Sequence, residues 1–177
     1  QIGVFGLETM GKLITLDVLI VGAKGVGVET AKNLILAGPR SVAVFDPAPV
    51  EPADMGCNYY LRPDDVGRRR DEACISQLAE LNSYVRVTAL TEATALDESI
   101  LGRFRCVVFT DNVPQADLLR FNAFCRAQTP AIGFIVAYVR GLTGRAFVDF
   151  GPAHMVHDPT GEQTKIVSVF GVESDAT

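Results

Sequence analysis

The stretch Asp17-Val-Leu-Ile-Val-Gly-Ala-Lys-Gly-Val-Gly-Val28 decides the fold of this 177-residue chain. An apolar run ends in a glycine turn, and the turn opens an amphipathic segment that stops at Gly38-Pro39. A strand, a glycine turn and a helix in this order are typical of a doubly wound α/β sheet, because backbone N–H groups at the start of the helix attract phosphate. The sequence therefore predicts a nucleotide-binding arrangement with Gly22, Gly25 and Gly27 in the turn.

The turn departs from the dinucleotide-binding fingerprint at one position. In Gly22-Ala-Lys-Gly-Val-Gly27, Lys24 stands where the fingerprint has its second glycine. That glycine lets a pyrophosphate approach the backbone, and a long cationic side chain fills the same space. We therefore expect a nucleotide-binding fold with an altered nucleotide site. A Walker-type triphosphatase is excluded, because neither Gly-Lys-Ser nor Gly-Lys-Thr follows the turn.

Hydrophobic patterning and turn residues predict the order of the elements. Strands are expected over residues 18–21, 41–46, 84–89, 106–110 and 131–137. Helices are expected over residues 7–15, 27–37, 64–81, 98–104 and 114–128, with a long loop over 47–56. Residues 143–150 and 154–157 are predicted to form β structure outside this alternation.

The expected fold class is α/β, a doubly wound Rossmann-like, mostly parallel sheet with a strand-rich C-terminal extension. Near-continuous apolar strands fit a parallel sheet that helices cover on both faces. We assign this domain to residues 1–158. The tail 159–177 is interpreted either as a linker into a further domain or as a plain C-terminal strand over its apolar residues 166–170.

Charge and hydropathy exclude two kinds of partner. A formal net charge of -5 argues against a general nucleic-acid binder, which needs a basic surface. The basic run Arg68-Arg69-Arg70 is followed at once by Asp71-Glu72, so it is interpreted as a solvated helix face. No apolar run approaches the length of about 20 residues that spans a bilayer, so no membrane partner is expected.

The four cysteines lie far apart and form no Cys-x-x-Cys pair, and only two histidines accompany them. We therefore expect no metal site. Cys74, Cys106 and Cys125 have apolar neighbours and are predicted to be small core residues. A reducing compartment, cytoplasmic or nuclear, fits this pattern best.

Two acidic residues end predicted strands at the carboxyl edge of the sheet, where ligands bind in open α/β folds. Asp46 could accept hydrogen bonds from ribose hydroxyls, or it could cap the loop that follows. Asp111 could hold Mg²⁺, or it could cap the helix that begins near Pro114. A simple dehydrogenase is disfavoured, because Lys24 blocks the pyrophosphate approach and no downstream His or Lys pairs with a substrate pocket.

The run Gly-Ala-Lys-Gly-Val-Gly-Val-Glu-Thr-Ala-Lys-Asn-Leu-Ile-Leu-Ala-Gly (22–38) resembles the adenylation fold of enzymes that activate ubiquitin and ubiquitin-like proteins. Further segments resemble the N-terminal half of the eukaryotic ubiquitin-activating enzyme: residues 60–67, 78–85, 140–151 and 158–162. In that family two related adenylation domains form a pseudo-symmetric pair, and only the C-terminal one activates ubiquitin. The resemblance implies that this chain is the inactive N-terminal domain, and that residues 159–177 lead into the inserted first half of the catalytic-cysteine region.

The resemblance also assigns residues to a vestigial nucleotide site, with no catalytic residue. The family's ribose-binding Asp matches Asp46, and its Mg²⁺-binding Asp matches Asp111. Its phosphate-binding Lys falls on Arg70, its phosphate-binding Arg on Cys57, and the following Gln on Asn58. A thiol cannot replace the bidentate charge of a guanidinium. Hence we expect no cofactor on this domain, and ATP and Mg²⁺ only in the parent enzyme.

The implied partners are the active adenylation domain of the same chain, ubiquitin in the full-length enzyme, and a second copy of the fragment. One alternative is the small subunit of a heterodimeric activator of a ubiquitin-like protein. Another is a free-standing nucleotide-binding adenylyltransferase, which would need the missing phosphate Arg and usually paired zinc cysteines.

Overall fold

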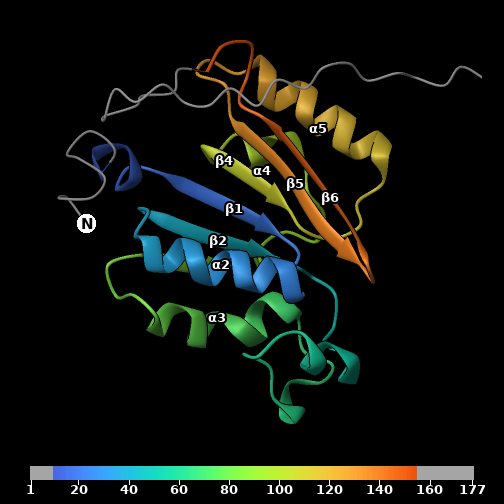
Figure 1. The fold of residues 1–177 in the computed structure, drawn as a ribbon. Helices are drawn as coiled ribbons and strands as arrows, with labels where there is room; N and C mark the ends of the chain where they lie inside the picture. The colour runs from blue at the N-terminus through green and yellow to red at the C-terminus, as the bar shows by residue number, and fades with distance from the viewer. Residues whose placement is uncertain (1–9, 155–177) are drawn as a thin grey trace, which may run out of the picture.

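The computed structural model describes residues 10–154, which form one six-stranded sheet with helices on both faces (Figure 1). The strands are β1 (Asp17–Val21), β2 (Ser41–Phe45), β3 (Arg86–Ala89), β4 (Cys106–Phe109), β5 (Gly133–Arg140) and β6 (Thr143–Asp149). Their order is β3-β2-β1-β4-β5-β6; all neighbours pair in parallel except β5 and β6, which are antiparallel. The predicted doubly wound sheet is confirmed, and the C-terminal extension of the described part is the single strand β6.

The helices are α2 (Gly25–Ala37), α3 (Arg70–Glu80), α4 (Glu98–Leu101) and α5 (Gln115–Ala127), with 3-10 turns at Pro52–Gly56 and Pro63–Asp65. Alternate residues of β1 point to opposite faces, so the sheet has two apolar cores. Val18 and Ile20 pack with α2 and α3, whereas Leu19 and Val21 pack with α4 and α5. Figure 1 shows α2 and α3 over the β1–β2 side and α5 beside β5.

Most predicted elements differ from the observed ones by one to three residues, but the helix predicted over 64–81 begins only at Arg70. Asp65 does not cap it. Its carboxylate accepts from the backbone N–H of Arg62 at 2.9 Å and closes the 3-10 turn. Gly67 then turns the chain with a φ of 89°, and α3 follows.

Some predictions fall at the ends of the described region. Of the helix expected over 7–15, residues 10–13 are helical. His154 is not in a strand, and residues 155–157 and the tail 159–177 lie outside the described residues. No helix between residues 10 and 154 is long and apolar enough to cross a membrane.

Candidate functional site

The glycine turn lies between β1 and α2 at the carboxyl edge of the sheet, beside the point where strand order reverses between β1 and β4. Gly22 has a φ of 100°, and a Cβ there would lie 2.9 Å from Cβ of Asp111. A Cβ on Gly27 would lie 2.0 Å from the carbonyl oxygen of Gly22. Thr110 fixes the turn, since its hydroxyl donates to the carbonyl oxygens of Val21 at 2.9 Å and Gly22 at 3.1 Å. These two glycines are therefore required by the packing of the turn itself, whether or not a ligand binds.

Lys24 is the N-cap residue of α2, and its side chain makes no cap hydrogen bond. Its ammonium nitrogen lies 3.6 Å from Oδ2 of Asp111, and both side chains are about half exposed. A Cβ on Gly25 would lie 3.4 Å from Cβ of Cys57, an ordinary contact. The pair of Lys24 and Asp111 lines a cavity of about 520 Å³ that also contains Cys57 and Arg140. A phosphate here would have to compete with Asp111 for Lys24, and Mg²⁺ would have to compete with Lys24 for Asp111.

Asp46, at the end of β2, is 6% exposed. Its Oδ2 accepts the backbone N–H of Ala23 at 2.9 Å, and its Oδ1 accepts that of Ala48 at 3.3 Å. Nη1 of Arg70 lies 2.8 Å from both carboxylate oxygens. Because these protein donors occupy both oxygens, the carboxylate has little capacity left for ribose hydroxyls.

Arg70 is the centre of this network and is 3% exposed. Besides Asp46, its guanidinium donates to Asp54 Oδ2 at 2.9 Å and to the carbonyl oxygen of Pro49 at 3.1 Å. Burial by itself would lower the pKa of Arg70, but the bonds and charges of Asp46 and Asp54 outweigh it and raise the pKa. The guanidinium therefore stays charged and directed inward, and it holds the loop between β2 and α3 against the glycine turn.

Asn58 also joins this loop to the turn and is 1% exposed. Its Nδ2 donates to the carbonyl oxygen of Ala23 at 2.8 Å, and its Oδ1 accepts the N–H of Tyr60 at 2.9 Å. Ala23 is thus held on both sides, by Asp46 through its N–H and by Asn58 through its carbonyl. The structure brings the predicted residues together at one edge, but the polar atoms of Asp46, Asn58 and Arg70 are bonded to other groups of the protein.

Two interpretations from the sequence are wrong. The N-cap of α5 is Pro114 and it receives no side-chain hydrogen bond, so Asp111 does not cap this helix; its Oδ1 accepts from the N–H of Asn112. The run from Arg68 to Glu72 is not a solvated face throughout, because Arg70 and Asp71 are buried. Patterning missed Asp54 and Asp71, whose partners are distant in sequence and gave no local signal.

Asp71 extends the buried network to a second arginine. It is fully buried, accepts the backbone N–H of Asp46 at 2.9 Å, and pairs with Nη2 of Arg69 at 2.7 Å. The hydrogen bonds from Arg69 to Asp71 raise the pKa of the Arg69 guanidinium.

The cysteines between residues 10 and 154 divide into one exposed thiol, Cys57, and three that are wholly or partly buried. Burial raises the pKa of Cys74 to about 12, and those of Cys106 and Cys125 to about 11. These three thiols are protonated at neutral pH and behave as core residues, as predicted. Within the described residues, no group of three or more His, Cys, Asp or Glu could hold a metal ion.

Comparison with known proteins identifies the family of this chain. The profile of the ThiF family matches residues 1–156. The chain is 42% identical over 175 residues to ubiquitin-activating enzyme E1 1 of Triticum aestivum, covering 99% of this chain and 16% of that protein. It is 43% identical over 175 residues to ubiquitin-like modifier-activating enzyme 1 of Homo sapiens, with the same coverage.

The chain thus spans 16% of the length of these two relatives and matches their N-terminal region. Among solved structures, E. coli MccB with succinimide superposes with a TM-score of 0.70 at 19% identity, over 84% of this chain and 46% of that one. The likeness to MccB shows a shared fold. The chain belongs to the ThiF family and corresponds to the N-terminal fragment of ubiquitin-activating enzymes.

Proposed function

We propose that this chain is the inactive N-terminal adenylation domain of a ubiquitin-activating enzyme, and that its role is architectural. The proposal is supported by identities of 42% and 43% to enzymes of that name over 99% of the chain. In the parent protein it would pack against an active adenylation domain, which would use ATP and Mg²⁺ to adenylate ubiquitin in the cytoplasm and nucleus.

One observation carries the proposal: Arg70 is bound to Asp46 and Asp54 inside the protein. These two acids and this guanidinium would otherwise be available at the carboxyl edge, where a nucleotide binds in such folds. On the outer side of the turn, Lys24 and Asp111 pair with each other in the same way, so a phosphate or Mg²⁺ would have to compete for these charges. The residues present therefore do not fit Mg·ATP, and we assign no chemical step to this domain.

The alternative that this chain is the small subunit of a heterodimeric activator is less favoured. The similar enzymes are single chains about six times longer than the matched region. A free-standing adenylyltransferase is also less favoured. It would require an open ribose acceptor, whereas Asp46 already accepts from Arg70, Ala23 and Ala48.

The proposal is tested in the full-length enzyme by ubiquitin-dependent exchange of pyrophosphate into ATP. Asp111→Asn should leave the exchange rate within about twofold of the unsubstituted enzyme, because the chemistry belongs to the other half. A variant that lost adenylate formation while keeping its melting temperature would show that this half is a working nucleotide site.

A further inference from the structure

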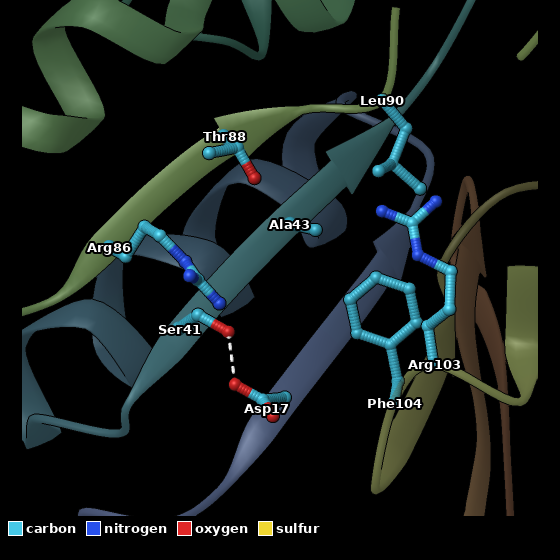
Figure 2. Close-up of a pocket in the computed structure, with 8 residues that line it drawn as sticks. All are labelled: Asp17, Ser41, Ala43, Arg86, Thr88, Leu90, Arg103 and Phe104. Carbon is cyan, nitrogen blue, oxygen red and sulfur yellow. Dashed lines mark hydrogen bonds between the residues drawn. The ribbon is translucent and has the colours of Figure 1, made fainter. Parts of the chain in front are cut away.

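A second polar region lies at the opposite, amino-terminal edge of the parallel strands. On this edge, within residues 10–154, helices α4 and α5 contribute the helical residues of the core on this face of the sheet. A cavity of about 350 Å³ lies on this face, bounded by Ala43, Leu90 and Phe104 on its apolar side and by Arg86 and Arg103 on its polar side (Figure 2).

Strand register brings a row of polar residues to the start of this face. Arg86 is paired with Ser41 across β3 and β2, and Ser41 with Asp17 across β2 and β1. Arg105 comes next, since its backbone N–H donates to the carbonyl oxygen of Asp17 at 3.0 Å. The row therefore reads Arg, Ser, Asp, Arg across the sheet, and Figure 2 shows Arg86 extending from β3 towards Ser41.

The charges in this row do not balance. The Asp17 carboxylate is used by Arg40, which binds it through two nitrogens, and by the hydroxyl of Ser41. Arg103 is paired with Glu92 at 2.9 Å, and both side chains are more than half exposed. Between residues 10 and 154, Arg86 and Arg105 have no acidic partner. Two exposed guanidiniums thus flank a face of a protein whose net charge is -5.

We propose that this face docks an acidic segment of the longer protein to which the chain belongs. Carboxylates of the segment pair with Arg86 and Arg105, and an apolar side chain of the same segment enters the cavity beside Phe104. This inference rests on the proposed function in one respect, namely that the domain is part of a longer chain. Two observations support it: Arg86 and Arg105 are complementary in charge to an acidic segment, and most of the length of the similar enzymes lies outside the matched region.

The chemistry at this edge favours an acidic protein segment over a nucleotide. Helices α2, α3 and α5 begin at the carboxyl edge, so the N-terminal N–H groups that attract phosphate lie at the other edge of the sheet. Arginine binds carboxylates through two parallel hydrogen bonds, and the apolar floor suits a side chain next to the acid.

The test is arginine labelling of the full-length protein by phenylglyoxal, with each site followed by mass spectrometry and N-acetylarginine amide as the reference. We expect Arg86 and Arg105 to react at least tenfold more slowly than the reference. Arg105→Glu should weaken docking and raise the rate at Arg86 at least fivefold. The matched charge reversal Arg62→Glu, at an exposed arginine next to the 3-10 turn, should leave the reaction rate of Arg86 unchanged.

Three results would overturn the docking proposal. First, both arginines could react with phenylglyoxal as fast as the reference. Second, the reaction rate of Arg86 could stay slow in the Arg105→Glu variant. Third, the two arginines could be protected only when 10 mM phosphate is added, which would identify a free anion as the ligand. The proposed function fails separately: an unsubstituted protein that protects Arg86 but does not activate ubiquitin would refute that function alone.

Discussion

Around the glycine turn, polar side chains are buried and bonded to one another, whereas on the β5–β6 hairpin apolar side chains face solvent. Arg70 and Asp46 are 3% and 6% exposed. On the hairpin, Val139 is 61% exposed and Val148 50%, and Leu142 at its tip is fully exposed. The polar groups around the turn stabilise the domain by bonding one another, whereas the hairpin leaves apolar side chains exposed, and we propose that another protein binds there.

The largest expected effect is on the buried network. Arg70→Ala leaves the carboxylates of Asp46 and Asp54 buried without their cation, and breaking a buried pair in this way costs about 3–5 kcal/mol. Arg68→Ala removes a half-exposed arginine from its pair with Asp65 and should cost about 1 kcal/mol or less. Urea denaturation measures both, and equal small losses would refute the buried network.

The buried interior also predicts a response to alkaline pH. An unfolded cysteine ionises near its ordinary pKa of 9.0, whereas burial raises the pKa of Cys106 to about 11. The unfolded state therefore binds fewer protons above pH 9, and the free energy of unfolding falls as the pH rises from about 9 towards 11. Each such thiol contributes up to about 1.4 kcal/mol per pH unit.

Stability curves measured between pH 8 and 10.5 test this response, with Cys106→Ala as the matched variant. The variant should lose stability less steeply above pH 9. Identical slopes for the two proteins would mean that the Cys106 thiol is not protected from ionisation.

On the hairpin side, we expect the isolated chain to associate with itself at high concentration, because exposed apolar patches of this kind mark protein contacts. Val148→Asp should weaken association at least tenfold, which is about 1.4 kcal/mol, with little change in melting temperature. Val66→Asp, at an exposed valine outside the hairpin, should leave association unchanged. Sedimentation velocity measures both, and a monomeric unsubstituted chain would contradict the expectation.

The smallest effect is expected at the outer side of the turn. Asp111→Ala removes a half-exposed partner of Lys24, and such surface pairs contribute about 1 kcal/mol or less. Thermal unfolding of the two variants shows whether Asp111→Ala loses much less stability than Arg70→Ala. A loss as large as that of Arg70→Ala would place Asp111 within the buried network.

Local pattern was sufficient to predict the region from Asp17 to Gly38, because an apolar strand, a glycine turn and a periodic helix follow one another without interruption. It failed at Arg70 for a physical reason. A charged run is solvated unless distant residues neutralise it, and here Asp46 and Asp54 lie 24 and 16 positions away. The late start of α3 has a local cause instead: the carboxylate of Asp65 accepts the N–H of Arg62 and closes a 3-10 turn, and Gly67 then turns the chain with a positive φ.

Titration of the isolated chain with Mg·ATP by isothermal calorimetry tests directly whether the residues around the glycine turn still bind a nucleotide. We expect no saturable heat and a dissociation constant of about 1 mM or weaker, because Arg70 occupies Asp46 and Asp54 and Lys24 is paired with Asp111. A dissociation constant in the low micromolar range requires about 8 kcal/mol of favourable contacts. That result would contradict the account, since it would mean that the residues around the glycine turn still form a nucleotide site.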